Sequence, residues 1–113
     1  MSEAYEAYEA PPFAVDVRRE GGVAAVSLVG ELDMATAPEL EEALTGLEAG
    51  YERLVVDLSR CSFFASSGIS ILLEHNARAA RDGFELVIVK APPIVQRIFD
   101  LTHLDGVLTF RDA

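Results

Sequence analysis

Apolar and polar residues alternate near the start of the sequence, a pattern typical of strands that bury one face. The alternation runs over residues 13–17, and a second apolar run rich in β-branched residues follows at 23–29. Between them, Glu-Gly-Gly at residues 20–22 indicates a tight turn. We therefore predict that the two strands form a hairpin, with the first strand at an edge of the sheet.

A helical pattern follows the hairpin and begins near Thr36. Thr36 and Glu39 have the spacing of a capping box, and Pro38 is tolerated in a first helical turn. Apolar residues recur at intervals of three and four, which predicts one buried face. The predicted inward residues are Leu40, Ala43, Leu44 and Leu47, and the predicted outward residues are Glu39, Glu41, Glu42 and Glu48.

The next stretch predicts a buried strand, a connector and a second helix. Residues 54–58 form a short apolar run, residues 59–65 are interpreted as the connector, and the helical pattern begins at Ser66 and ends at Asp82-Gly83. The predicted apolar stripe of this helix is Ile69, Leu72, Leu73, Ala77 and Ala80. Glu74, His75, Arg78 and Arg81 fall mostly outside that stripe.

The last part of the chain repeats the alternation of strand and helix. Residues 86–89 predict a buried strand, Pro92-Pro93 opens a third helix, and residues 107–110 predict a short final strand. The apolar residues of the third helix are Ile94, Val95, Ile98, Phe99 and Leu101. Three strand–helix–strand units imply parallel strands. The sequence therefore predicts a single α/β domain with a mixed, mostly parallel sheet, an N-terminal antiparallel hairpin and three main helices.

Candidate functional residues follow the ends of several predicted strands. Glu31 and Asp33 follow the second strand, Ser66 and Ser67 open the second helix, and residues 90–93 follow the fourth strand. Folds of this kind place functional groups beyond the carboxyl ends of their parallel strands. We therefore expect these residues to converge at one edge of the sheet.

The two serines allow two interpretations. Serine is a preferred N-cap, because its oxygen accepts a hydrogen bond from an amide of the first helical turn. Alternatively, a hydroxyl at this position receives a phosphate, which the amides and dipole of a helix N-terminus would hold. Residue chemistry alone leaves both interpretations of Ser66 and Ser67 open.

Charge and composition narrow the functional classes. The 113 residues include nine basic and nineteen acidic residues, a net charge of −10, which argues against nucleic acid or an anionic membrane as partner. The single cysteine, Cys61, is expected in the core, and a single cysteine excludes an intramolecular disulfide. The sequence also has no apolar run of membrane-spanning length, and we therefore expect a cytoplasmic protein. Residues 1–12 are acidic and are expected to form a mobile tail before a domain at 13–113.

The sequence offers little for catalysis or for cofactor binding. His75 and His103 are not placed beside Ser66 by the predicted elements, and no nucleophile elbow or glycine-rich phosphate loop is present. Two histidines and one cysteine without metal-ligand spacing argue against a zinc site. We expect no enzymatic activity, no cofactor and no metal.

Three motifs, in this order and spacing, resemble the STAS domain of the anti-sigma factor antagonist family. They are Gly30-Glu31-Leu32-Asp33, then Val55 to Leu58 with Phe63 to Gly68, and finally Val95 to Phe99 with Leu104. The resemblance covers residues 13–110. It implies binding to an anti-sigma factor that is also a serine kinase of the histidine-kinase ATPase fold, and release of a sigma factor.

The resemblance also implies roles for individual residues. By position, phosphorylation falls on Ser66, with Ser67 as the alternative, and partner binding on Glu31, Asp33, Ser66, Ser67 and Gly68. One departure is Ala65, which stands where the family motif has an aspartate. It leaves a second hypothesis open, namely an interaction or scaffold domain that keeps the surface and has lost the phosphorylation switch.

Overall fold

The computed structural model describes residues 12–113 and contains the hairpin that the sequence predicts. Strands β1 (Ala14–Glu20) and β2 (Val23–Leu32) pair antiparallel, and Gly21 adopts a φ of +60° in the turn between them. Except for Pro12, the predicted mobile tail at residues 1–12 lies outside the described residues. The domain boundary after residue 12 therefore stays a prediction.

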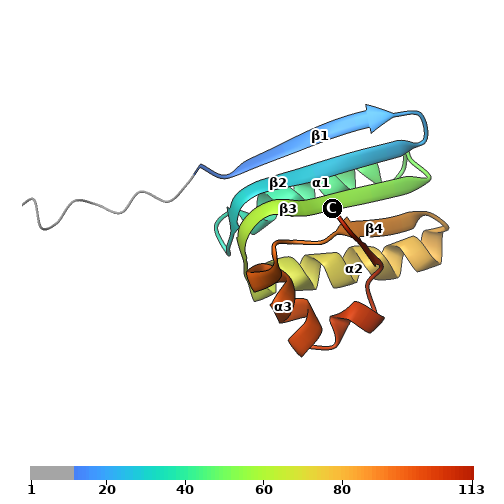
Figure 1. Ribbon diagram of the computed structural model, residues 1–113. Coiled ribbons are helices and arrows are strands. Elements are labelled where there is room, and N and C mark those ends of the chain that lie inside the picture. Colours follow the sequence, from blue (N-terminus) through green and yellow to red (C-terminus); the bar gives the residue numbers. More distant parts are fainter. Residues whose placement is uncertain (1–11) are drawn as a thin grey trace, which may run out of the picture.

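Helices and strands alternate after the hairpin. The remaining elements are α1 (Ala37–Leu47), β3 (Arg53–Phe64), α2 (Ser66–Asp82), β4 (Glu85–Val89), α3 (Pro93–Leu101), a 3₁₀ helix (Leu104–Gly106) and β5 (Phe110–Arg111). The five strands lie in the order β1-β2-β3-β4-β5, and β2 to β5 run parallel (Figure 1). The predicted α/β fold with a mixed sheet and three main helices is confirmed.

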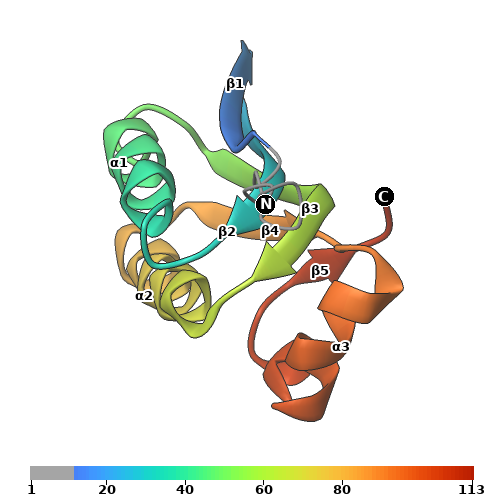
Figure 2. The ribbon, with the colours of Figure 1, turned by 90° about the vertical axis from the view of Figure 1, so that its left-hand side faces the viewer.

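The core lies between the sheet and its helices. Figure 2 shows α1 and α2 side by side on one side of the strands, with α3 beside β5. Burial along β2 alternates, with Val26 and Leu28 fully buried and Ser27 between them only half-buried. Aromatic rings connect α3 to the sheet, with Phe99 of α3 centred 5.6 Å from Phe64 of β3 and 5.1 Å from Phe110 of β5. Cys61 is fully buried, as the sequence predicts.

The predicted connector at residues 59–65 is wrong, because β3 continues to Phe64. Its pairing with β2 survives two register shifts, between Ser27 and Val29 and between Gly30 and Glu31. Such bulges bend a strand while pairing continues, and Figure 1 shows both ribbons curving at this end. The polar residues that look like a connector are therefore the exposed positions of a bent strand.

The end of the chain also departs from the prediction. Residues 104–106 form the 3₁₀ helix, and the last strand is Phe110–Arg111 rather than residues 107–110. In α3, the predicted apolar residues Ile94 and Leu101 are 84% and 67% exposed. Gln96 is buried instead, and its side-chain oxygen accepts a 3.0 Å hydrogen bond from the Ala91 amide.

The buried face of α2 is rotated from the predicted one. Leu72 is fully buried, as predicted, but Ala77 and Ala80 are exposed, and the inward positions are taken by His75 and Ala79. His75 can face inward because its ring nitrogens meet carboxylates of α1. These carboxylates belong to Glu41 and Glu48, so the predicted outward orientation of both glutamates is wrong.

Candidate functional site

Strands β2 and β3 end side by side, and this brings the candidate residues together. Leu32 is paired with Phe64, and the Ala65 amide donates a 2.9 Å hydrogen bond to the Leu32 carbonyl. Because α2 begins at the next residue, Ser66 lies beside the turn that follows Leu32. The convergence predicted for Asp33 and Ser66 at the carboxyl edge of the sheet is therefore present in the fold.

Asp33 organises the turn between β2 and α1. Its Oδ1 accepts hydrogen bonds from the backbone amides of Ala35 (2.9 Å) and Thr36 (3.0 Å). The Thr36 hydroxyl in turn accepts from the Asp33 amide at 2.9 Å and reaches the Glu31 carbonyl at 3.1 Å. The capping box predicted for Thr36 is wrong, because this hydroxyl is engaged by the turn and caps no amide of α1.

These hydrogen bonds favour the ionised form of Asp33. The backbone N–H of Thr36 holds the pKa of the carboxyl below its usual 3.8, and although partial desolvation opposes the shift, the Thr36 hydroxyl and the Ala35 amide reinforce it. A lowered pKa means that the turn is fully stabilised above the usual value, and that this stabilisation is lost as the pH falls through the lowered pKa. At neutral pH, Asp33 therefore presents a negative charge on the turn that directly follows Leu32, the residue that is hydrogen-bonded to Ala65.

The two serines differ in exposure. The residue at the N-cap position is Ala65, and no side chain of residues 12–113 caps the first turn of α2. The interpretation of either serine as a cap is therefore wrong. Ser66 is exposed, whereas the hydroxyl oxygen of Ser67 is buried and has no hydrogen-bond partner among the described residues. A partner or an enzyme can therefore reach the Ser66 hydroxyl directly, and it cannot reach that of Ser67 without movement of the chain.

Gly68 allows α2 to begin so close to the sheet. A Cβ atom at this position would clash with Leu32 Cδ2 and would lie 2.7 Å from Phe64 Cζ. Both of these side chains belong to the core. Because Gly68 has no side chain, the first turn of α2 can pack against the last residues of β2 and β3. This contact determines the position of Ser66.

Exposed apolar side chains accompany the charged turn. Met34 follows Asp33 and is 81% exposed, Phe63 near the end of β3 is 48% exposed, and Ile94 in the first turn of α3 is 84% exposed. These residues follow, or lie at, the carboxyl ends of β2, β3 and β4, the edge that carries Asp33 and Ser66. The sequence analysis did not predict that these three apolar residues are exposed. Met34 was the one sequence signal for such a surface, because it is an apolar residue inside a polar turn.

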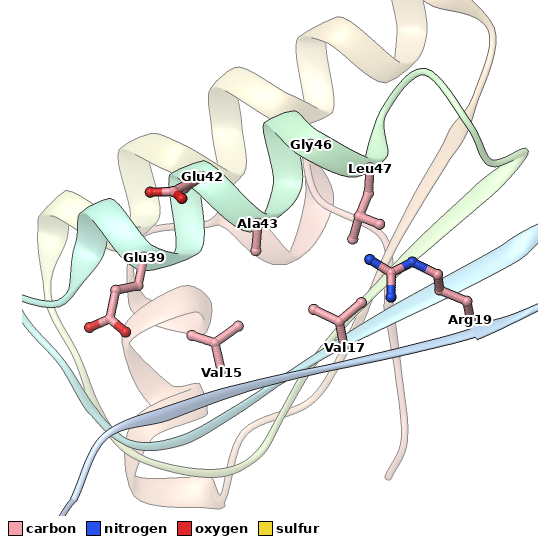
Figure 3. Close-up of a pocket in the computed structure, with 8 residues that line it drawn as sticks. All are labelled: Val15, Val17, Arg19, Glu39, Glu42, Ala43, Gly46 and Leu47. Carbon is pink, nitrogen blue, oxygen red and sulfur yellow. The ribbon is translucent and has the colours of Figure 1, made fainter.

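A cavity of about 370 Å³ lies elsewhere, between β1 and α1 (Figure 3). Its lining residues are Val15, Val17, Arg19, Glu39, Glu42, Ala43, Gly46 and Leu47. Arg19 and Glu39 lie at opposite ends of it, and Val15 and Val17 face α1. None of the residues at the Asp33–Ser66 edge lines this cavity, so it is separate from the candidate site.

Comparison with known families identifies the domain. Residues 15–109 match the family model described as "Mlab, STAS domain". The chain belongs to the STAS domain family. The chain is also 31% identical over 84 residues to the anti-sigma-B factor antagonist of Staphylococcus aureus (strain NCTC 8325 / PS 47), an alignment that covers 74% of this chain and 78% of that protein.

Further relatives extend this assignment. An anti-sigma factor antagonist from Mycobacterium paratuberculosis is 33% identical, with a TM-score of 0.75 over 88% of this STAS chain and 85% of that structure. Unphosphorylated SpoIIAA, an anti-sigma factor antagonist, is 19% identical with a TM-score of 0.76, and so shares the fold. Osmosensory protein A of Mycobacterium tuberculosis is 33% identical over 75 residues, but the aligned region is only 46% of its length.

Replacement of Gly68 tests the packing that positions the site. We expect Gly68→Ala to lower the free energy of unfolding by about 1–3 kcal/mol, because the added methyl group overpacks the contact with Leu32 and Phe64. The matched control is Gly46→Ala in α1, where a Cβ has no neighbour within 4 Å. There we expect no loss, or a gain of up to about 1 kcal/mol, from the better helix propensity of alanine. Urea unfolding of both variants measures the difference, and equal stabilities would contradict the proposed packing role.

Proposed function

We propose that this STAS domain is an anti-sigma factor antagonist that binds its partner through the edge formed by Glu31, Asp33, Ser66, Ser67 and Gly68. The observation that carries the proposal is the exposed Ser66 hydroxyl at the start of α2, next to the anionic Asp33 turn. Relatives named as anti-sigma factor antagonists support it. Binding to the anti-sigma factor would free a sigma factor.

The composition of the surface suggests the chemistry of the partner. Asp33 contributes charge, Met34, Phe63 and Ile94 contribute exposed apolar area, and the whole chain carries a net charge of −10. Interfaces commonly combine an apolar centre with charges that steer association. A partner with an apolar patch bordered by basic residues fits this edge, and we propose an anti-sigma factor of the serine-kinase type with the histidine-kinase ATPase fold.

Phosphorylation of Ser66 is the proposed switch, and the geometry supports it in two ways. First, Ser66 is exposed while the Ser67 hydroxyl is buried, so Ser66 is the accessible acceptor. Second, the Gly68 amide is the first at the start of α2 to donate a backbone hydrogen bond, and its acceptor is the Ala65 carbonyl. The amides of Ser66 and Ser67 precede it and have no acceptor within the helix. A phosphate would therefore be held locally, and its charge beside Asp33 would repel an acidic group of the partner.

An unswitched interaction or scaffold domain is the second candidate function. Ala65 favours it, because the family motif has an aspartate there and alanine offers no carboxylate to orient the hydroxyl of Ser66 or assist a kinase. In this case the same surface binds a partner without being modified. Intact mass after treatment with the cognate kinase separates the two candidates.

We further propose that the protein is not an enzyme and works in the cytoplasm. Among residues 12–113, no hydrogen bond joins either histidine to Ser66 or Ser67, and a serine nucleophile needs such a base. The structure holds no helix within the same residues that is long and apolar enough to cross a membrane. The single buried cysteine is compatible with a reducing compartment.

Asp33 variants test the binding surface and separate charge from structure. Asp33→Asn keeps an oxygen that can accept from Ala35 and Thr36 but removes the charge, whereas Asp33→Ala removes both. If charge pairing with the partner matters, Asp33→Asn should weaken binding to the anti-sigma factor by about 2–5 kcal/mol, and Asp33→Ala by at least as much. Calorimetric titration measures the affinity.

The control for this comparison is Asp16→Asn on edge strand β1, which should bind like the unmodified protein. Circular dichroism confirms that each variant is folded. Unchanged affinity in both Asp33 variants would exclude this edge as the interface.

Phosphorylation is tested by intact-mass analysis after incubation with the cognate kinase and ATP. We expect one added phosphate on the unmodified chain and on Ser67→Ala, and none on Ser66→Ala, because only the Ser66 hydroxyl is accessible. Ser66→Asp should reduce partner binding, and Ala65→Asp should speed the reaction if a carboxylate helps the kinase.

Two results would change the assignment. Absence of phosphate on the unmodified chain would favour the unswitched domain. Phosphate that persists in Ser66→Ala but disappears in Ser67→Ala would move the modification to Ser67.

A further inference from the structure

A polar cluster lies between α1 and α2, apart from the Asp33–Ser66 edge. Glu41 projects from α1 and Glu48 from its C-cap, and Glu74, His75 and Arg78 project from α2. The His75 side chain is completely buried, whereas those of Glu41 and Glu74 are 36% and 54% exposed. The cluster therefore combines a solvent-accessible outer side with a buried imidazole.

Both ring nitrogens of His75 face carboxylates, so a neutral ring leaves one of its lone pairs directed at a carboxylate oxygen. Its Nδ1 contacts the carboxylate of Glu48, and its Nε2 lies 3.2 Å from Oε2 of Glu41. A neutral imidazole has one N–H and one lone pair. If the N–H faces Glu48, the lone pair of Nε2 faces a carboxylate oxygen, which is repulsive unless a proton or a metal ion lies between them.

The geometry suits a metal ion. One ligand atom each from Glu41, Glu74 and His75 lie within 4.8 Å of one another. Zinc takes nitrogen and carboxylate ligands at about 2.0–2.2 Å in a tetrahedral arrangement, which places neighbouring ligand atoms about 3.3 Å apart. The 3.2 Å separation of His75 Nε2 and Glu41 Oε2 fits this spacing, and it is equally the length of a direct hydrogen bond between the two atoms. Glu74 supplies the third ligand atom, and its side chain is 54% exposed.

The charge around His75 and the contact of its Nδ1 with Glu48 also suit a metal ion. Three carboxylates surround the imidazole, and the one guanidinium in the cluster, Arg78, is shared between Glu74 at 3.1 Å and Glu48 at 3.5 Å. Negative charge thus exceeds positive charge around Nε2. The contact of Nδ1 with Glu48 is the carboxylate–histidine arrangement that orients metal-binding histidines and fixes their tautomer.

We propose that Glu41, Glu74 and His75 form a binding site for a divalent transition-metal ion, represented by zinc, which joins α1 to α2. A water molecule would occupy the fourth position. The nitrogen ligand favours zinc over magnesium or calcium, which prefer oxygen ligands. This departs from the expectation of no metal site. That expectation rested on the lack of local ligand spacing, whereas Glu41 and His75 are separated by 34 positions and meet only in the fold.

The test titrates zinc chloride into the tag-free 113-residue chain after treatment with a chelator, using calorimetry at neutral pH and thermal unfolding with and without zinc. We expect one equivalent of zinc to bind and to raise the melting temperature. Glu41→Gln and Glu74→Gln should each weaken binding at least tenfold. Glu41→Gln should remain stable without metal, because its amide can donate to the lone pair of Nε2.

Two matched controls accompany these variants. Glu42→Gln neutralises a glutamate of α1 outside the cluster, and His103→Asn removes the other histidine, which is exposed. Both should bind zinc like the unmodified chain. The proposal is overturned if the unmodified chain binds no zinc, which would assign a proton to the position between His75 and Glu41, or if binding is unchanged in both Glu41→Gln and Glu74→Gln.

Discussion

The close approach of α2 to the ends of β2 and β3 is the contact on which the candidate site depends. It requires Gly68, since any side chain there would overlap the core residues Leu32 and Phe64. The backbone hydrogen bond from Ala65 to Leu32 ties the start of the helix to the neighbouring strand. Together these contacts determine where α2 begins, and therefore where Ser66 lies relative to Asp33.

This placement gives the neighbouring residues Ser66 and Ser67 different exposures. The Ser67 hydroxyl is buried and the Ser66 hydroxyl is presented to solvent, although the two residues are chemically identical. Asp33 has a structural task as well, because its carboxylate holds the turn that begins α1. An anionic side chain that its own turn already holds in place loses little conformational entropy when it binds a partner. The acidic turn, the accessible hydroxyl and the exposed Met34, Phe63 and Ile94 make this edge suitable for protein recognition.

Much of the fold follows from the sequence because it depends on local periodicity. The Glu-Gly-Gly turn, the proline that opens α3 and Gly83 at the end of α2 are local signals in the sequence, and the alternation of strands with helices predicts that β2 to β5 run parallel. The convergence of Asp33 and Ser66 followed from the same topology.

Features that depend on tertiary contacts were not predictable. His75 faces inward only because α1 supplies its carboxylate partners, and β3 extends past residue 58 only because bulged pairing with β2 continues. Of the two interpretations left open for the serines, the cap is wrong because Ala65 occupies the N-cap position.

Hydrogen exchange with the anti-sigma factor bound tests whether a partner binds at the edge formed by Asp33 and Ser66. Binding at this edge predicts slower amide exchange in peptides that span residues 31–36 and 63–70. It predicts no change in the hairpin turn at residues 18–23, which joins β1 to the opposite end of β2. Protection of the hairpin turn, with unchanged exchange around Asp33 and Ser66, would contradict it.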